Sequence, residues 1–185
     1  ASNNTAVGKD AMLSNTTGAN NVAVGYAALD AATTATGNTA VGYNTLSSNT
    51  TGYSNVALGN NALTTITTGT HNVALGNNSL QANTANLNVA VGYDALNDNS
   101  TGTQNVAIGA YSLDANTTAS NNTALGYQAL TGATTGANNT AVGMNSMVAN
   151  TTGGSNVAIG GSALTANTTA SNNTAVGNAA LGANT

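Results

Sequence analysis

The sequence has no cysteine and no proline, and its aromatic and charged residues each make up only 3% of the chain. Without cysteine, disulfide bonds, thiolate catalysis and cysteine-ligated metals are excluded. One lysine among 185 residues cannot form the clustered basic surface that neutralises phosphates, so nucleic-acid binding is excluded as well. No apolar run approaches the roughly 20 residues that cross a membrane, and we predict no membrane span in this segment.

What the sequence does contain is a repeat built on the motif Asn-Thr/Val-Ala-Val/Leu/Ile-Gly. The motif occurs eleven times, with its asparagine at residues 4, 21, 38, 55, 72, 88, 105, 122, 139, 156 and 173. The spacing is 17 residues, except for 16 residues between Asn72 and Asn88. Because a fixed short period indicates a stacked array, residues 1–185 are interpreted as a single repeat array. Both ends fall inside a repeat, so we expect a segment of a longer fibre.

We number each repeat from its asparagine, which is position 1. Position 3 is alanine in all eleven copies, position 4 is Val, Leu or Ile, and position 5 is glycine. A short aliphatic stretch closed by glycine is typical of a β-strand that ends in a turn. Position 8 is Ala, Ser or Thr and position 9 is Leu or Met, which predicts a second short strand. Positions 10–17 are rich in Asn, Thr and Gly and form a polar return.

The repeat is too short for a helix-loop-helix unit, and its apolar positions lack helical spacing. Asn-Gly and Asp-Gly pairs, the strongest hairpin signals, are absent. The sequence therefore predicts an all-β fold, a parallel β-solenoid of eleven 17-residue coils, with equivalent positions stacked in columns. At about 4.8 Å per coil, the array forms a rod segment of roughly 50 Å.

Lateral partners are expected because each coil has only two or three sizeable apolar side chains, worth roughly 1.5–3 kcal/mol each when buried. The invariant alanine at position 3 has two interpretations. It provides a close contact between neighbouring chains, or it lines a coil interior with room for no more than a methyl group. The candidate residues of a chain interface are Ala23, Ala57, Ala107, Ala124 and Ala158.

Two segments show the motif most clearly: 105–112 and 156–163 each contain Asn-Val-Ala-Ile-Gly, followed three residues later by Ser or Ala. This pattern covers all eleven repeats and resembles the head repeats of trimeric autotransporter adhesins, the YadA-like heads. Similar repeats occur in phage tail fibres and surface filaments. The resemblance implies a left-handed β-roll, a side-by-side homotrimer and a head that binds host matrix or surfaces. It also implies an extracellular or cell-surface location, with a virion tail fibre as the alternative.

Catalysis requires a nucleophile, base and orienting group, or two carboxylates, brought together in one place. The only histidine, His71, lies in the polar return, where other repeats have Asn, Ser, Gln or Gly, and is interpreted as a loop substitution. Asp98 and Asp114 fall on neighbouring coils and are a candidate pair for sharing a cation, but the glycine/aspartate nonapeptide of calcium-binding rolls is absent. We predict no enzyme, no cofactor and no metal.

Three regular features remain as candidate binding or modification sites. Tyr26, Tyr43, Tyr93 and Tyr127 all occupy position 6, where they form a candidate aromatic strip for sugars or another chain, or cover the turn. Threonine pairs at positions 13 and 14 resemble the arrays of ice-binding solenoids. Asn-x-Ser/Thr sequons begin at Asn15, Asn116 and Asn167 and would permit glycan attachment in a secreted protein.

These observations predict a structural or adhesive extracellular fibre segment, the head or shaft of a trimeric surface adhesin or of a polymeric surface filament. The expected partner is the same chain, in a trimer or in a head-to-tail filament, with a glycan or a host-surface ligand as a further partner. The alternatives are the shaft of a phage tail fibre, or a β-solenoid surface that binds carbohydrate or ice.

Overall fold

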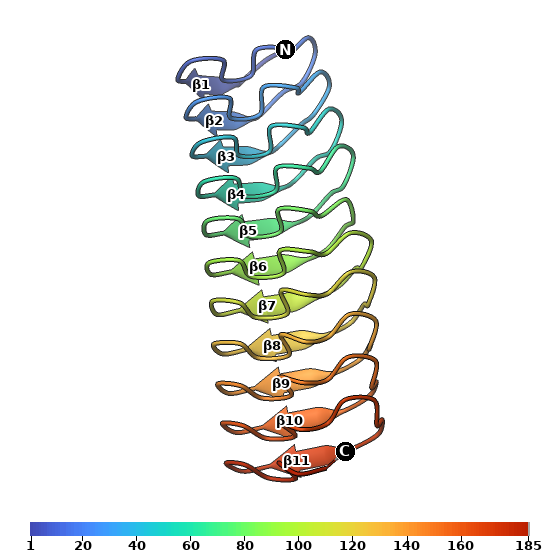
Figure 1. Ribbon diagram of the computed structural model, residues 1–185. Coiled ribbons are helices and arrows are strands. Elements are labelled where there is room, and N and C mark those ends of the chain that lie inside the picture. Colours follow the sequence, from blue (N-terminus) through green and yellow to red (C-terminus); the bar gives the residue numbers. More distant parts are fainter. Residues whose placement is uncertain (185) are drawn as a thin grey trace.

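The computed structural model describes residues 1–184, which form eleven short strands joined by turns (Figure 1). The strands are β1 Thr5–Val7, β2 Val22–Val24, β3 Thr39–Val41, β4 Val56–Leu58, β5 Val73–Leu75, β6 Val89–Val91, β7 Val106–Ile108, β8 Thr123–Leu125, β9 Thr140–Val142, β10 Val157–Ile159 and β11 Thr174–Val176. Each strand occupies positions 2–4 of its repeat, and together they make one sheet in sequence order. All pairs are parallel, so the chain is a parallel β-solenoid, as predicted.

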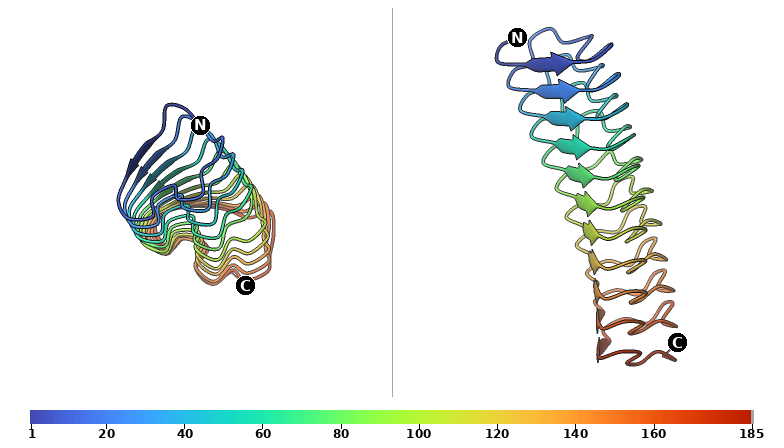
Figure 2. Two further views of the ribbon diagram at one scale, coloured as in Figure 1. Left: turned by 90° about the horizontal axis from the view of Figure 1, so that it is seen from above. Right: turned by 90° about the vertical axis from the view of Figure 1, so that its left-hand side faces the viewer.

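Equivalent positions of successive repeats lie opposite each other in this sheet. Ala107 of β7 pairs with Ala90 of β6 and with Ala124 of β8, and the other strand pairs follow the same register. The predicted columns of identical positions are therefore confirmed. The strands turn gradually from β1 to β11, so that the stack is a twisted rod (Figure 2), as expected from the handed twist of β-strands.

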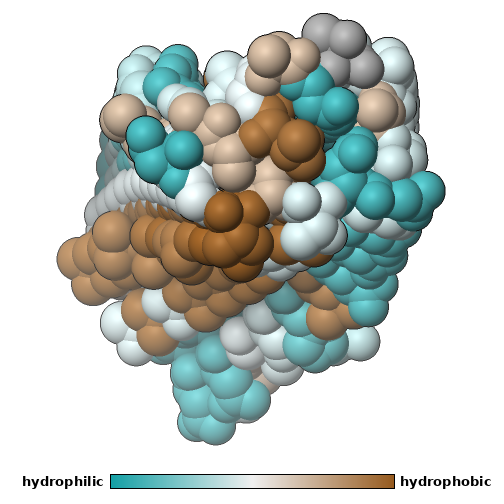
Figure 3. Space-filling model, turned by 90° about the horizontal axis from the view of Figure 1, so that it is seen from below, coloured by the Kyte–Doolittle hydropathy of each residue, from teal (hydrophilic) through white to brown (hydrophobic). Residues whose placement is uncertain are grey.

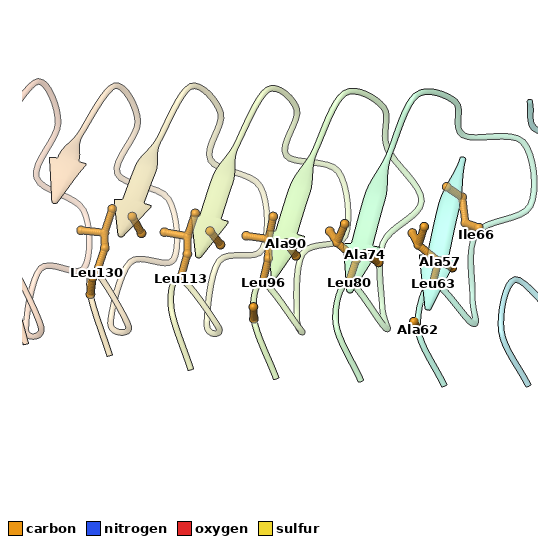
Figure 4. Packing of buried hydrophobic residues seen from close by; sticks show 14 of the residues in the cluster. Ala57, Ala62, Leu63, Ile66, Ala74, Leu80, Ala90, Leu96, Leu113 and Leu130 are labelled. Carbon is orange, nitrogen blue, oxygen red and sulfur yellow. The ribbon is translucent and has the colours of Figure 1, made fainter. Parts of the chain in front are cut away.

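The interior of the rod is lined by position 3 of the strand and by position 9 of the following turn. Leu63, Leu80, Leu96, Leu113 and Leu130 are all at 0% exposure and lie in one row beside the position 3 alanines (Figure 4). The small alanine is needed because the opposite wall of the coil is close enough for leucine to fill the space. A narrow core of two columns, one of methyl groups and one of leucines, therefore runs the length of the solenoid.

The assignment of the position 3 alanines to a chain interface is wrong. Ala23, Ala57, Ala107, Ala124 and Ala158 are at 0% exposure within a single chain, so no neighbouring chain can reach their methyl groups. Successive residues of a strand point to opposite faces, and the side chains of positions 2 and 4 therefore point outward. The other interpretation of this alanine, a coil interior with room for a methyl group only, agrees with the burial.

The predicted second strand at positions 8 and 9 is also wrong, because each repeat contains one strand. Positions 7 and 9 have positive φ in nearly every coil, for example +51° at both Asn44 and Leu46, which prevents an extended backbone. Their N–H groups still bond along the rod. Asn44 donates to the C=O of Tyr26 in the preceding coil at 3.0 Å, and Leu46 donates to the C=O of Ala62 in the following coil at 3.1 Å.

Position 1 forms a buried asparagine ladder that closes each coil and joins it to the next. Asn55 Nδ2 donates to the C=O of Gly69 across its own coil at 2.8 Å, while Asn38 Oδ1 accepts the backbone N–H of Asn55 at 2.9 Å. Both ends of the amide are thus satisfied in a buried site, which is the condition under which a buried polar group stabilises a fold. The asparagine column predicted from the sequence is therefore also a structural brace.

A second asparagine ladder at position 12 is interrupted where the repeat has alanine or isoleucine. Asn99 Nδ2 donates to Asn83 Oδ1, and Asn116 Nδ2 donates to Asn99 Oδ1, both at 2.7 Å. The next coil has Ala133 at this position, and Asn116 Oδ1 is buried with no hydrogen-bond partner among the described residues. Asn15 Oδ1, which faces the coil of Ala32, lacks a partner in the same way.

Replacing Ala133 with asparagine is expected to complete this ladder and to raise the free energy of unfolding by about 1–2 kcal/mol, because an orphaned buried oxygen gains a donor. The backbone fits the change, since Ala133 and Asn116 make the same turn, donating to Leu130 and Leu113 at 3.2 Å each. Urea unfolding measures the effect. Ala32→Asn should give a similar gain, whereas equal or lower stability in both variants would contradict the account of the orphaned oxygens.

The 16-residue step between Asn72 and Asn88 shortens only the polar return. Thr84 N–H donates to the C=O of Ser100 at 3.0 Å as a position 13 residue, and Asn72 Nδ2 donates to the C=O of Ala85 at 2.9 Å as it would to position 15. The missing residue is therefore position 14. Because that position lies on the outside of the coil, Val73 still pairs with Val89 and the strand register is kept.

Within residues 1–184, no helix is long and apolar enough to cross a membrane.

Candidate functional site

The outward side of the sheet, which we call the outer face, consists of the residues at positions 2 and 4 of all eleven strands. Position 4 is Val, Leu or Ile in every coil, and position 2 is Val or Thr. The most exposed members within the stack include Leu58 at 52% and Leu125 at 45%. Figure 3, which looks along the molecule from the β11 end, shows hydrophobic residues aligned in a band along one side. The outer face is thus a continuous apolar strip.

Three properties of the outer face indicate what it can contact. It carries no charged residue at positions 2 or 4, so covering it requires no ion to be desolvated. It lies on a hydrogen-bonded sheet, so its side chains are held in a fixed register. Exposed apolar strips of this extent are unusual on monomeric proteins and mark surfaces of interaction. A binding surface for another apolar strip is therefore the chemistry that this face supports best.

The tyrosines at position 6 lie beside the outer face, just after the glycine that ends each strand. The rings of Tyr26 and Tyr43 are stacked with 5.3 Å between centroids and 12° between planes, and Lys9 Nζ lies 5.2 Å from the Tyr26 centroid. Tyr93 and Tyr127 each pack edge to face against Tyr111, at 5.3 and 6.1 Å. The rings therefore contact one another along the rod as well as covering the turns.

The sequence prediction missed Tyr111 as a member of this group, because Tyr111 occupies position 7 rather than position 6. A spacing of 18 residues from Tyr93 and 16 from Tyr127 was the available signal, since both separations are one coil plus or minus one residue. Asp94 also belongs to this area, where its negative charge raises the pKa of the Tyr93 hydroxyl. The group presents mainly ring edges and hydroxyl groups to solvent.

The two threonine columns differ in what their hydroxyl groups do. At position 13 the hydroxyl donates to the C=O of the next coil, as from Thr16 to Thr33 at 2.9 Å and from Thr151 to Thr168 at 3.0 Å. At position 14, Thr118, Thr135 and their equivalents are exposed, and their hydroxyl groups make no hydrogen bond with the described residues. Only the position 14 column is therefore free to bind a ligand.

The acidic pair predicted to share a cation lies where expected but remains a pair. Asp98 N–H donates to the C=O of Asp114 at 3.0 Å, which places the two residues on adjoining coils. Residues 1–184 hold no group of three or more His, Asp or Glu side chains that could bind a metal. They also contain no pocket. His71 is exposed in the polar return, where its ring packs edge to face on Tyr53.

Asp114 is the acidic residue whose environment most disfavours its charge. Burial, followed by the negative charges of Asp98 and Asp94, raises the pKa of its carboxyl to about 6 from 3.8, against the lowering effect of the backbone N–H groups of Ala115 and Asp114 itself. One of its carboxylate oxygens is buried with no hydrogen-bond partner among residues 1–184. The folded state therefore binds the proton more tightly than the unfolded chain does.

Stability is consequently expected to depend on pH through Asp114. The raised pKa contributes stability that is fully present below 3.8 and is lost as pH rises to about 6. Since the side chain is half exposed, screening reduces the effect to about 1 kcal/mol. Urea unfolding at pH 4 and pH 7 measures it, and Asp114→Asn should remove most of the difference. A variant that keeps the full difference would assign the effect to other groups.

The sequons noted at Asn15, Asn116 and Asn167 lie at position 12, inside the coil. Asn116 and Asn167 are at 0% exposure, and each donates its Nδ2 to a C=O at 3.1 Å, that of Ala119 and Ala170 respectively. Asn15 donates in the same way to the C=O of Gly18 at 3.3 Å. The folded chain therefore does not present these amide nitrogens for glycan attachment.

Comparison with protein-family models, with curated proteins and with solved structures finds no match to this chain.

Proposed function

We propose that this chain is a structural, non-catalytic segment of an extracellular fibre, the head or shaft of a surface adhesin or filament, in which chains associate side by side through their outer faces. The observation that carries the proposal is the uninterrupted strip of Val, Leu and Ile at position 4 along the sheet. In this arrangement three chains surround a common axis. The left-handed winding implied by the resemblance to adhesin heads belongs to the same proposal.

The energetics support association through this face. Covering the exposed half of a Val, Leu or Ile side chain is worth roughly 0.5–1.5 kcal/mol, and the strip offers one such side chain per coil. Because every coil of each copy adds the same rise, a partner with the same repeat meets the strip in register at every level. A second copy of this chain is therefore the partner that fits best.

The fibre role follows from how the stack is held together. Each coil bonds to its neighbours through backbone hydrogen bonds and asparagine ladders, so mechanical continuity arises from repetition. The nearest groups with shifted acid-base behaviour, Asp94, Asp114 and Tyr93, form no cleft around a substrate. A passive shaft or an adhesive head, on a cell surface or on a virion tail, uses what this molecule offers.

The proposal is tested by the mass of the particle in solution. Analytical ultracentrifugation of the parent chain should give a species of three chains, and the double variant Leu125→Asp, Ile159→Asp should sediment as one chain with an unchanged circular dichroism spectrum. The matched control, Thr135→Asp with Thr169→Asp, places the same charges on the exposed position 14 column and should keep the parent mass. A parent that sediments as one chain, or a face variant that keeps three, would refute the proposal.

The free threonine column favours one second candidate, an ice-binding surface. The position 14 hydroxyl groups and methyl groups lie in a row with one coil spacing, about 4.8 Å, between neighbours. Thermal hysteresis of the parent solution is the test: a freezing-point gap that disappears when Thr118, Thr135 and Thr152 are changed to asparagine would support ice binding, and no gap in the parent would exclude it.

A further inference from the structure

A second set of sequons spans the junction between one coil and the next, from position 17 to position 2. Its members are Asn121-Asn122-Thr123, Asn138-Asn139-Thr140 and Asn172-Asn173-Thr174. In each of them the middle asparagine belongs to the position 1 ladder, whereas the first asparagine is exposed. The acceptor residue of these sequons therefore lies on the surface, in contrast to the acceptors at position 12.

The side chains of these sequons are free to react. At Asn121 the backbone has φ +62° and its N–H donates to the C=O of Thr103 at 3.1 Å, which ties down the main chain. The side-chain amide makes no hydrogen bond with the described residues, and Thr123, two residues later, is exposed with a free hydroxyl group. Asn172 and Thr174 have the same arrangement. A modifying enzyme would reach both the amide nitrogen and the hydroxyl.

Other sequons of the chain lack one of these two features. At position 12 the amide is buried, as at Asn150, whose Nδ2 donates to the C=O of Gly153 at 2.9 Å. At Asn77 the amide is exposed, but the hydroxyl of Ser79 is buried and donates to the C=O of Gly76 at 3.0 Å. The folded structure thus divides the sequons into accessible and inaccessible sets.

The two residues of the accessible sequon also occur together more often than their packing requires. Position 2 is threonine in five repeats, and in four of them position 17 is asparagine: Asn3, Asn121, Asn138 and Asn172. Position 2 is valine in six repeats, and only one of these follows an asparagine, Asn20. The paired side chains make no hydrogen bond to each other at residues 121–174, so the fold gives no reason for the association. A requirement for the sequon itself would explain it.

We propose that Asn121, Asn138 and Asn172 are acceptor sites for an N-linked sugar transferred to the folded chain from a sugar diphosphate donor. The asparagine Nδ2 attacks the anomeric carbon of the sugar, a C–N bond forms, the C–O bond to the diphosphate breaks, and one amide proton passes to a base of the transferase. No electrons are gained or lost. Because Asn121 and Asn138 lie on adjoining coils, one sugar hinders the other, and Asn172 is expected to carry the fullest occupancy.

Mass spectrometry of peptides from the protein isolated from its natural source tests the proposal. The chain has one lysine and no arginine, so a protease of broad specificity is required. Sugar is expected on Asn172 and on Asn121 or Asn138, and none on Asn116, Asn150 or Asn167. No sugar on any asparagine, or equal occupancy of the buried and exposed sets, would overturn the proposal. Single sugars would indicate a nucleotide-linked donor, and a preformed oligosaccharide would indicate a lipid-linked one.

Variants made in the same source separate the sequon from the fold. Thr174→Val should abolish the modification at Asn172, whereas Thr174→Ser should keep it, and valine is compatible with the fold because six repeats have it at this position. Gly37→Asn creates an equivalent sequon before Thr39 and should add a new site. Retained sugar in Thr174→Val, or an unmodified residue 37 in Gly37→Asn, would count against recognition of the folded sequon. This inference is independent of side-by-side association.

Discussion

Replacing Gly109 with alanine is expected to lower the free energy of unfolding by about 3–5 kcal/mol. Gly109 ends β7 with φ +130°, a conformation that costs a residue with a side chain about 1–3 kcal/mol. A Cβ there would also lie 2.5 Å from the C=O oxygen of Gly126 in the next coil, and relieving that contact separates two coils at a further cost of about 1–3 kcal/mol. Urea unfolding followed by circular dichroism measures the loss.

Gly37→Ser is the matched control for this variant. Gly37 also has positive φ, +68°, but the nearest atom to its Cβ would be Ser54 Oγ at 3.9 Å. Serine occupies the same position at residues 54 and 155, with φ +57° and +59°. The control should therefore change stability by no more than about 0.5 kcal/mol. Equal effects of the two substitutions would show that contact between neighbouring glycines does not limit the stacking.

Replacing Ala107 with leucine is expected to cost about 3 kcal/mol, because the added carbons enter a closed interior. Ala107 is at 0% exposure and pairs with Ala90 and Ala124 in the coils before and after it. A larger side chain must push the position 9 leucines away or open the coil. Thermal unfolding of the variant measures the loss, and a drop in particle mass would follow only from the loss of the fold.

Ile108→Leu is the control on the other side of the same strand. Ile108 belongs to the outer face, and leucine occupies the equivalent position in β4 and β8. This variant should keep the stability of the parent within about 0.5 kcal/mol. If Ala107→Leu were equally harmless, the interior would be wider than the burial of the alanine column indicates.

Much of the architecture could be predicted because a fixed period constrains parallel stacking directly. If every repeat has the same length, parallel strands that pair in register bring identical positions together, and no knowledge of side-chain packing is required. This is why the strand positions, their order and the asparagine column were correctly expected. The shortened coil confirms the point, since the residue missing after Thr84 falls in the polar return and leaves Val73 paired with Val89.

The inside and outside of the strand were harder to assign, because a three-residue strand has one residue facing one way and two facing the other. The invariance of alanine at position 3 was the useful signal. An interior bounded by other parts of the same coil accepts one side-chain size, whereas a face open to the outside accepts Val41, Leu58 and Ile108 alike. The chain interface was placed on the wrong side because constancy was attributed to contact between chains.

The missing second strand also left a trace in the sequence. Position 7 is often Asn or Asp, residues that adopt positive φ more readily than others, as at Asn61 and Asp94. Position 9 is always Leu or Met and never Val, Ile or Thr, which a true strand position would favour. A β-branched side chain is strained at the φ of +50° to +55° found at Leu130 and Met147. The local turn chemistry therefore outweighs the apolar pattern.

The direction of the backbone hydrogen bonds determines how the rod would respond to being pulled at its ends. The bonds join one coil to the next and so run along the rod, as from Val106 N–H to the C=O of Asn122 at 2.9 Å. End-to-end tension would therefore peel the terminal coil first, and each released coil of 17 residues would add at most roughly 60 Å of extended chain. A bundle of such rods, in contrast, would share the load between chains. Side-by-side association would thus convert a stack that unravels from its ends into a fibre with tensile strength.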